Sequence, residues 1–311
     1  MLRLDAITLK QLRALHAVAS QGSLTAAAAE IGQTVPAIHS QIKNLENAVG
    51  VPILVRPSGA GPTELTPEGE EVLRAATRIE GILSQAADQI RARATGQIGH
   101  VTISVVSTSK YFAPGLVKIL SQTEPEIGIS LRVGNRESVI ADLDDGRCEL
   151  AIMGRPPRVP AVRSLPLGPH PHGVILPIDH PFAQEDGFDP ALLVQETFLS
   201  RERGSGTRIL MQRFLDRFEE GPVAQIVEMD SNETIKQAVR AGLGIALLSL
   251  HTVHDELQEG RLAQLRGLRL PIIRHWYLVW PAHVERGPAA TRIAERIEKL
   301  NGTFLPGKAS V

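Results

Sequence analysis

The feature of the sequence that most restricts its fold is a long amphipathic stretch from Thr66 to Arg93. The tripeptide Thr66-Pro67-Glu68 is typical of a helix start, because threonine can cap the first amides and proline is tolerated at the first helical position. At about 1.5 Å per residue the helix would be roughly 40 Å long. Apolar residues recur along it at alternating spacings of four and three, at Val72, Ala76, Ile79, Leu83, Ala86 and Ile90. This heptad pattern predicts a helix over about 66–95 that connects domains and pairs with a partner helix, although an ordinary amphipathic helix packed on its own domain has the same pattern.

Length and composition limit what surrounds this helix. The chain has 311 residues, 43% of them hydrophobic, which is enough for two or three domains. A net charge of -1 gives no global basicity of the kind that marks a nucleic-acid binder. The single cysteine, Cys148, excludes an internal disulfide framework and is expected to be structural. We find no apolar signal core and no apolar run of membrane-spanning length, so we expect a soluble cytoplasmic protein.

The first 65 residues predict three short helices and a hairpin. Apolar spacing indicates a helix over 8–21, a second from Ser23, and a third capped by Thr34. A short strand over 51–55 and a returning strand over 63–65 would form a wing that carries Arg56. Two short helices joined by a tight glycine-containing turn fit a helix-turn-helix motif, so we expect a winged helix-turn-helix domain over residues 1–65.

From Val101 onward the pattern changes to short apolar strands that alternate with helices. This alternation is typical of an α/β domain with a parallel sheet covered on both faces. We expect an effector domain over 96–311 with two lobes, built like the clamshell of periplasmic binding proteins, whose ligand lies between the lobes at the strand ends. The predicted strands are 101–106, 129–134, 149–154, 173–177, 197–200, 224–229, 244–250 and 275–281, with helices over about 112–123, 136–146 and 289–300; lobe I would take about 96–168 and 272–311, and lobe II about 169–271.

The first seventy residues resemble the LysR-type bacterial transcription regulators. Together the following segments form a specific signature, although any one of them would be weak: Gly22-Ser23-Leu24-Thr25-Ala26-Ala27-Ala28, Pro36-Ala37-Ile38, Gln41-Ile42, Gly50-Val51-Pro52-Ile53-Leu54 and Leu65-Thr66-Pro67-Glu68-Gly69. The chain departs from the family where it has Val35 for a common Gln and His39 for a common Ser. Its wing also lacks the usual arginine-rich end, so the departures concern base preference rather than fold.

The second half resembles one branch of this family, the regulators of Calvin-cycle carbon-fixation operons. The resemblance lies in segments such as Val105 to Pro114, Val133 to Glu137, Ala151 to Pro157 and Ser231 to Val239. It implies a ligand-responsive transcription regulator, with phosphorylated sugars, related organophosphates or reduced nucleotide cofactors as candidate ligands. It also implies a tetramer made of two dimers, whereas the heptad pattern alone gives no more than a pair.

The predicted helix-turn-helix motif and the family resemblance together indicate which residues contact DNA. The charges of this segment nearly cancel, so a helical protein-interaction module is the alternative. Dimerisation would offset the weak charge, because two DNA-binding domains double the contacts with an operator of two-fold symmetry. The predicted DNA-contact residues are Ser23, Thr25, Thr34, Val35, Pro36, Ala37, His39, Ser40, Lys43 and Arg56.

Several predicted strands end in small hydroxyl residues that also begin a helix. Free amides and hydroxyl groups at such places can hold an anion, and cationic side chains lie nearby in the sequence. The predicted effector-contact residues are Ser107, Thr108, Lys110, Asn135, Arg136, Arg155, Arg203, Ser205, Thr207, Ser231 and Asn232. The alternative is that these residues only cap helices and form surface ion pairs.

Other chemistries have little support in the sequence. The histidines at 170, 172, 180, 251 and 254 lack a carboxylate or cysteine constellation, so we expect no metal. No nucleophile-base pairing such as G-x-S-x-G is present, so we expect no enzymatic activity and no cofactor. A clamshell metabolite-binding protein or enzyme without a DNA-binding role, and a regulator whose cleft is filled by its own side chains, remain as alternatives.

Overall fold

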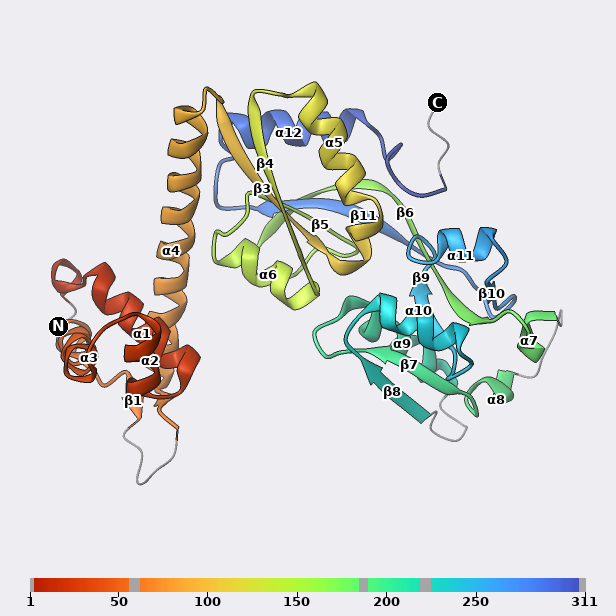
Figure 1. The fold of residues 1–311 in the computed structure, drawn as a ribbon, viewed down its shortest axis with the longest axis horizontal. Helices are drawn as coiled ribbons and strands as arrows, with labels where there is room; N and C mark the ends of the chain where they lie inside the picture. The colour runs from red at the N-terminus through yellow and green to blue at the C-terminus, as the bar shows by residue number, and fades with distance from the viewer. Residues whose placement is uncertain (1–2, 56–61, 185–189, 219–224, 308–311) are drawn as a thin grey trace. The chain divides into compact units, whose positions relative to one another are not determined.

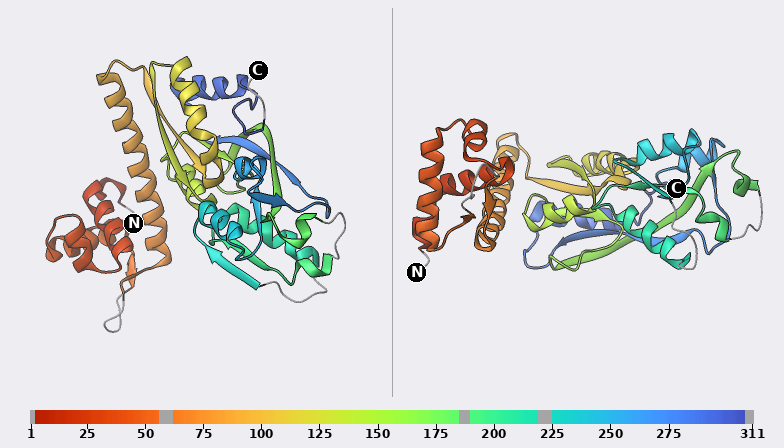
Figure 2. Two further views of the ribbon diagram at one scale, coloured as in Figure 1. Left: turned by 45° about the vertical axis from the view of Figure 1, so that its right-hand side comes forward. Right: turned by 90° about the horizontal axis from the view of Figure 1, so that it is seen from below.

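The computed structural model describes residues 3–55, 62–184, 190–218 and 225–307 (Figures 1 and 2). The chain forms two compact units. The first comprises Met1–Ala87 with Asp145–Arg147, and the second comprises Asp88–Asp144 with Cys148–Val311. The long helix α4 (Pro67–Ala94) begins in the first unit, and its last turns belong to the second.

The three predicted helices of the first unit are confirmed as α1 (Leu9–Gln21), α2 (Leu24–Glu30) and α3 (Val35–Val49), after a short 3-10 helix η1 (Leu4–Ala6). Each begins with a hydroxyl cap: the side chains of Thr8, Ser23 and Thr34 accept hydrogen bonds from backbone amides of the first turn. Glycines in the left-handed conformation, Gly22 and Gly50, follow α1 and α3.

The predicted wing is shorter than expected. Strand β1 (Leu54–Val55) pairs antiparallel with β2 (Glu64–Leu65), so the prediction of a strand over Val51 to Ile53 is wrong. Pro52 has no amide hydrogen, and its carbonyl accepts from the Thr66 hydroxyl at 2.9 Å. The Ile53 amide donates to a side-chain oxygen of Glu46 at 3.1 Å. These backbone groups therefore bond to side chains near the end of α3 and the start of α4 instead of pairing with another strand. Arg56 lies outside the described residues.

Part of the predicted dimer seam of α4 is used inside the first unit. Ala76 is fully buried in a core built from the three short helices and Ile53, and Val72 packs against the same core. Farther along the helix the seam is exposed: Ile79 is 38%, Leu83 43% and Ile90 68% exposed. The two interpretations of the heptad pattern therefore apply to different parts of one helix.

The second unit contains a mixed seven-stranded sheet with the order β10-β6-β11-β5-β3-β4, and β9 also pairs with β6. Strand β3 is parallel to β4 and β5, as predicted. However, β11, the late strand predicted over 275–281, runs antiparallel to β5 and β6, so the sheet is mixed rather than parallel throughout. The strands are β3 (Gly99–Val106), β4 (Ile127–Gly134), β5 (Leu150–Met153), β6 (Val162–Pro177), β9 (Ala246–Ser249), β10 (Leu262–Gln264) and β11 (Ile272–Pro281).

Strand β6 is much longer than the segment 173–177 that the sequence predicted. Pro166, Pro169 and Pro171 interrupt the apolar pattern and remove amide donors, which is why its first part does not read as a strand. Pairing with β11 along Val162 to His172 nevertheless holds this segment extended. Figure 1 shows β6 and β11 passing from the sheet that carries β3, β4 and β5 to the part of the unit that carries α7 to α11.

The two strands connect two lobes with separate cores. Lobe I has one core, centred on β3, β5 and Trp276, and lobe II has two adjoining clusters, one around Phe198 and one around Ile235. Lobe I contains η2 (Ser107–Tyr111), α5 (Ala113–Thr123), α6 (Arg136–Asp144) and α12 (Pro288–Lys299); lobe II contains α7 (Pro181–Gln184), α8 (Pro190–Leu193), β7 (Thr197–Arg201), α9 (Gly206–Leu215), η3 (Asp216–Phe218), β8 (Gln225–Met229), α10 (Asn232–Arg240) and α11 (His254–Gln258).

None of the helices in the described part of the chain is long and apolar enough to span a membrane. Among the same residues, no group of three or more histidine, cysteine, aspartate or glutamate side chains could hold a metal ion. Cys148 is 1% exposed, and burial raises the pKa of its thiol to about 12.

A glycine in the first turn of α4 tests how closely that helix packs on its own unit. A Cβ atom added at Gly69 would lie 2.0 Å from the Ile53 carbonyl oxygen, whereas at Gly115 in α5 it would meet nothing within 4 Å. Gly69→Ala should lower the free energy of unfolding by about 1–3 kcal/mol, because backbone must move. Gly115→Ala should raise it by up to about 1 kcal/mol through helix propensity. Thermal unfolding of both variants checks this, and equal melting temperatures would contradict it.

Candidate functional site

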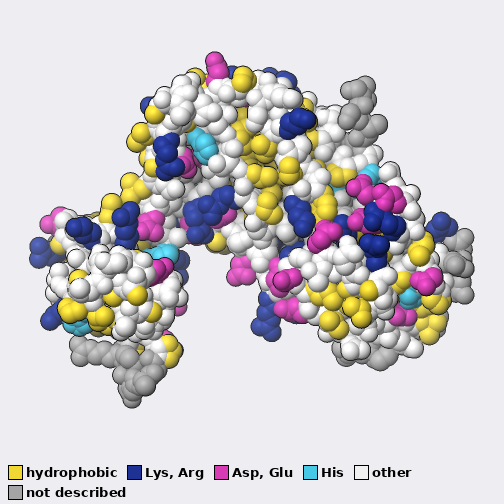
Figure 3. All heavy atoms as spheres, in the orientation of Figure 1, with side chains coloured by type: hydrophobic (Ala, Val, Ile, Leu, Met, Phe, Trp, Pro, Cys, Tyr) yellow, Lys and Arg dark blue, Asp and Glu magenta, His cyan; other side chains and the backbone are white. Residues whose placement is uncertain are grey.

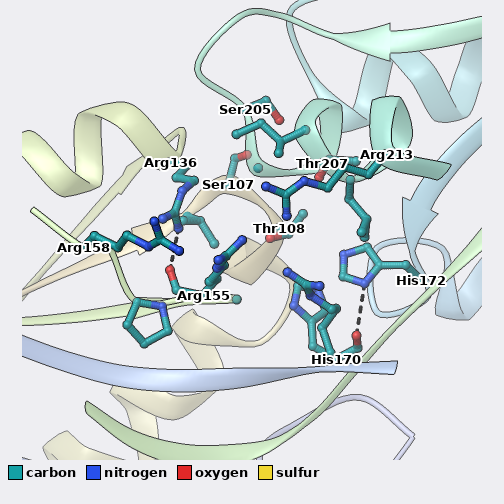
Figure 4. A pocket seen from close by; sticks show the side chains of 17 residues that line it. Ser107, Thr108, Arg136, Arg155, Arg158, His170, His172, Ser205, Thr207 and Arg213 are labelled. Atoms are coloured by element: carbon teal, nitrogen blue, oxygen red, sulfur yellow. Dashed lines mark hydrogen bonds between the residues drawn. The ribbon is translucent and has the colours of Figure 1, made fainter. Parts of the chain in front are cut away.

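The second unit contains a cavity of about 390 Å³ at the ends of several of its strands (Figure 4). Four places in the fold supply its wall: the end of β3, the start of α6 with the loop after β5, strands β6 and β11, and the start of α9. The lining residues are Val106, Ser107, Thr108, Arg136, Gly154, Arg155, Pro156, Arg158, His170, His172, Ser205, Gly206, Thr207, Ile209, Leu210, Arg213 and Arg274. The cavity has the size of a small-molecule site.

The structure brings one group of the sequence-predicted residues together in this wall. These residues follow strand ends or begin helices, as the sequence argument required. They are Ser107, Thr108, Arg136, Arg155, Ser205 and Thr207. Ser205 precedes α9 without a side-chain capping bond, and the first amides of a helix have no acceptor within it, so this end of the cavity can hold an anion.

The other predicted residues are not part of the wall. Lys110 faces Glu233 at 4.0 Å, and Arg203 is exposed. Asn135 and Ser231 each accept a hydrogen bond from a backbone amide at the start of a helix, α6 and α10 respectively. Asn232 is buried and accepts from Arg201 at 2.7 Å. For Asn135 and Ser231 the structure therefore supports the alternative that these residues cap helices.

Sequence reasoning missed five of the eleven polar residues that line the wall. His170, His172 and Arg274 lie within strands rather than at strand ends, and Arg213 lies in the last turn of α9. Only Arg158 offered a signal, because it follows the predicted residue Arg155 in the same loop. The others become visible only when β6, β11 and α9 are brought together.

The wall carries five arginines and no carboxylate: Arg136, Arg155, Arg158, Arg213 and Arg274. Burial lowers the pKa of Arg136, and the neighbouring charges of Arg155 and Arg274 lower it further. Arg136 donates to the Arg155 carbonyl oxygen and to the Met153 sulfur. None of the other four forms an ion pair with another described residue. The cavity thus has a concentrated positive charge that an anion would neutralise.

A hydrogen bond from Arg201 in β7 leaves the Ser107 hydroxyl as a donor toward the cavity. The Arg201 guanidinium is 3% exposed and donates to the Ser107 hydroxyl at 3.0 Å, to Asn232, and to Glu202. Because Ser107 accepts this bond, its own hydroxyl proton is available for another acceptor. The contact also joins the end of β3 in lobe I to β7 in lobe II.

Two neutral histidines form the floor of the cavity. Burial lowers the pKa of His172 to about 3 and that of His170 well below its ordinary value. His170 Nε2 lies 2.9 Å from the Ser249 hydroxyl, and its ring stacks on Trp276 with 3.6 Å between centroids. His172 Nδ1 donates to the His170 carbonyl oxygen at 3.0 Å. Neither ring adds positive charge to the five arginines.

All of the predicted DNA-contact residues except Arg56, which is outside the described residues, lie on α2 and α3 or just before them. Most are exposed: Thr25, Thr34, Val35, Pro36, His39, Ser40 and Lys43, while Ser23 and Ala37 are half-buried. On the face seen in Figure 3, basic, acidic and apolar side chains of this unit are interspersed, in keeping with its nearly balanced charge. The exposed face of α3 therefore carries mostly small or polar side chains, and Lys43 is its positively charged residue.

Two family models match the chain along most of its length. Residues 9–70 match the bacterial regulatory helix-turn-helix protein of the lysR family, and residues 94–301 match the LysR substrate binding domain. The chain belongs to the LysR family. The second match covers the two lobes and the cavity, so this LysR chain has a substrate-binding domain where the structure has its arginine-lined wall.

Similar proteins place the chain within the family. The HTH-type transcriptional regulator CbbR of Cereibacter sphaeroides is 58% identical over 307 residues, which cover 99% of each chain. A solved structure of the Synechocystis PCC6803 CcmR regulatory domain in complex with 2-PG is 31% identical, covers 65% of this chain and 97% of its own, and has a TM-score of 0.61. Full-length CbnR complexed with its target DNA, at 19% identity and a TM-score of 0.67 over 94% of this chain, shows the shared fold.

These matches establish the general role. The protein is a LysR-type transcriptional regulator with a helix-turn-helix domain and a two-lobed α/β substrate-binding domain, and it resembles the CbbR branch. Both predictions, of the family and of the fold class, are confirmed.

The buried histidines make the stability of this regulator depend on pH. Because the pKa of His172 is lower in the folded chain than in the unfolded chain, the unfolded chain takes up a proton first as pH falls below about 6.5. The free energy of unfolding should therefore fall by about 1.4 kcal/mol between pH 7.5 and pH 5.5 from this group. Urea denaturation at both pH values measures it. His172→Gln should reduce the pH dependence, whereas His275→Gln, on an exposed residue of β11, should not; equal slopes in both variants would contradict the assignment.

Proposed function

We propose that this LysR-type regulator controls carbon-fixation genes, binding operator DNA through α3 and a small polyanionic metabolite in the arginine-lined cavity. The observation that carries the metabolite assignment is the set of five arginines without a carboxylate. The operon assignment rests on 58% identity to a regulator named CbbR. The helix-turn-helix domain argues against the alternative of a metabolite-binding protein or enzyme without a DNA-binding role.

The arrangement of the arginines favours a ligand with two anionic groups. Arg136, Arg155 and Arg158 come from α6 and the loop after β5, whereas Arg213 comes from α9 in the other lobe. A ligand with an anionic group at each end would contact both sets and neutralise more charge than a single anion could. The 31% identical CcmR domain is described in complex with 2-PG, 2-phosphoglycolate, which carries a phosphate and a carboxylate. We take metabolites of this class as the candidate effectors.

Two copies of the chain would present two α3 helices to a two-fold symmetric operator. Thr34, Pro36, His39, Ser40 and Lys43 would face the major groove, with positioning contacts from α2. The exposed half of the α4 seam, from Ile79 to Ile90, supplies the apolar surface that a second helix would cover. The family resemblance adds a tetramer of two such dimers, acting in the cytoplasm.

The mechanism would be a shift between two arrangements of the lobes. The anion bridges residues of both lobes, so it binds more strongly to the arrangement that brings Arg213 toward Arg155. A ligand changes an equilibrium only by the difference between its affinities for the two states. Through the paired effector domains, the favoured arrangement would alter the spacing of the DNA-binding domains.

Titration calorimetry of the full-length protein tests the metabolite assignment. 2-Phosphoglycolate should bind more tightly than glycolate or inorganic phosphate, each of which has one anionic group. Arg155→Gln should weaken its binding by about 10- to 100-fold, the effect of losing one charge-assisted hydrogen bond. Arg203→Gln is the matched control: it is exposed and outside the wall, and should leave the affinity within about twofold. Equal losses in both variants would refute the site.

A charged substitution in the exposed apolar stripe of α4 tests the proposed dimer interface. Leu83→Asp places a charge on the exposed apolar stripe of α4 and should abolish dimerisation and operator binding while leaving metabolite binding intact. Ser84→Asp, an exposed neighbour that points about 100° away around the helix, should change neither. Sedimentation equilibrium and gel shifts on the upstream DNA of the gene measure both properties, and a Leu83→Asp variant with normal operator affinity would exclude the scheme.

A further inference from the structure

A second cavity, of about 550 Å³, lies in the same unit and shares no lining residue with the first. Three parts of the chain form it: η2 with the start of α5, the helices α10 and α11 with the turn after β9, and the segment that follows α12. Its lining residues are Tyr111, Phe112, Ile119, Lys236, His251, Thr252, His254, Asp255, Glu256, Thr303, Phe304, Leu305, Pro306 and Gly307. Both lobes therefore contribute to it.

A cluster of three aromatic rings connects the linings of the two cavities. The ring of Trp276 in β11 stacks on that of His170, which lines the first cavity, and the ring of His251, which lines the second, lies 5.9 Å from His170 and 6.3 Å from Trp276 between centroids. The Trp276 indole N–H donates to His251 Nδ1 at 3.1 Å. An indole nitrogen can only donate, so neutral His251 must carry its own proton on Nε2. Burial lowers the pKa of His251 to about 4, which keeps the ring neutral near pH 7.

The charged groups of this cavity are arranged unlike those of the first. The Lys236 ammonium is 4% exposed, lies 2.7 Å from a Glu256 oxygen and 3.1 Å from a Glu233 oxygen, and is 4.9 Å from the centre of the Tyr111 ring. Its positive charge is thus already neutralised. Asp255 adds an exposed carboxylate to the wall. An anion would meet net negative charge here, so the cavity selects against the metabolites that suit the arginine-lined wall.

Two hydrogen-bonding groups of the wall are left over. The Thr252 hydroxyl belongs to a residue that is 2% exposed, and it has no hydrogen-bond partner among the described residues. The His251 Nε2–H forms no hydrogen bond with another described residue, because the hydrogen bond of that ring involves its Nδ1. A ligand with a polar edge would give the buried Thr252 hydroxyl the partner it lacks and would also accept from the His251 Nε2–H. The rings of Tyr111 and Phe304 line the same space and suit a flat molecule.

We propose that this cavity is a second small-molecule site, which takes a flat uncharged ring with a hydrogen-bonding edge of the aromatic-amide class. The ring would lie against Tyr111 and Phe304, and its polar edge would meet Thr252 and His251. A ligand here would contact His251, which accepts the indole N–H of Trp276, and the Trp276 ring stacks on His170 in the wall of the arginine-lined cavity.

A matched pair of probes tests the assignment. Benzamide and benzoate have the same ring and nearly the same size but differ in charge. In the full-length protein carrying Trp280→Phe, Trp276 is the remaining tryptophan, because the chain has two. Its indole N–H signal in ¹⁵N NMR should move on titration with benzamide, and the benzamide affinity should exceed that of benzoate at least tenfold. Equal or tighter binding of benzoate, or no benzamide-dependent shift, would overturn the proposal.

Variants of residues in each cavity show which of the two cavities binds benzamide. Thr252→Val keeps the side-chain shape but removes the hydroxyl, and should weaken benzamide about fivefold, the loss of one neutral hydrogen bond. Thr252→Ser keeps the hydroxyl and should bind like the parent. Arg155→Gln, which alters only the first cavity, should leave benzamide affinity unchanged. If Arg155→Gln weakened benzamide while Thr252→Val did not, the probe would occupy the first cavity and the second-site proposal would be wrong.

Discussion

The antiparallel pairing of β6 with β11 is the constraint on which the rest of the sensing unit depends. The two strands pair along their length, from Ile272 with His172 to Pro281 with Val162. They carry His170, His172 and Arg274 to the first cavity, and they carry Trp276, which stacks on His170 and donates to His251 in the wall of the second. Because one ladder holds these groups, a change in its geometry would reach both cavities at once.

The two cavities of the second unit differ in how their charges are balanced. Five arginines around one cavity repel each other, and desolvation together with Arg155 and Arg274 lowers the pKa of Arg136. The fold tolerates this because the two histidines beneath stay neutral and because an anion at the site would remove the repulsion. Around Lys236, by contrast, carboxylates neutralise the cation internally. The same unit thus presents one wall whose positive charge favours an anion and one whose cation is already neutralised.

The candidate site was partly predictable, and the limit has a physical cause. Ser107, Arg136, Arg155 and Thr207 follow strand ends or begin helices, and that position is visible in a sequence because strands and helices have different periodicities. Strand-end position alone could not tell a ligand contact from a helix cap, so Asn135 and Ser231 were included although they cap α6 and α10. Residues in the middle of β6 and in the last turn of α9 reach the cavity only because distant segments pack together.

The sequence by itself determined the capped helices of the first unit, the long helix α4 and the LysR family, since caps, glycine ends and heptad spacing are local properties of the chain. Only the tertiary structure decided where the α4 seam stops being core: Ala76 is buried by helices that come before it, while Leu83 stays exposed. It also decided that β6 is a sixteen-residue strand despite its prolines, because β11 supplies the pairing. Finally, it decided that five arginines share one cavity, since residues far apart in the chain meet only once the sheet has formed.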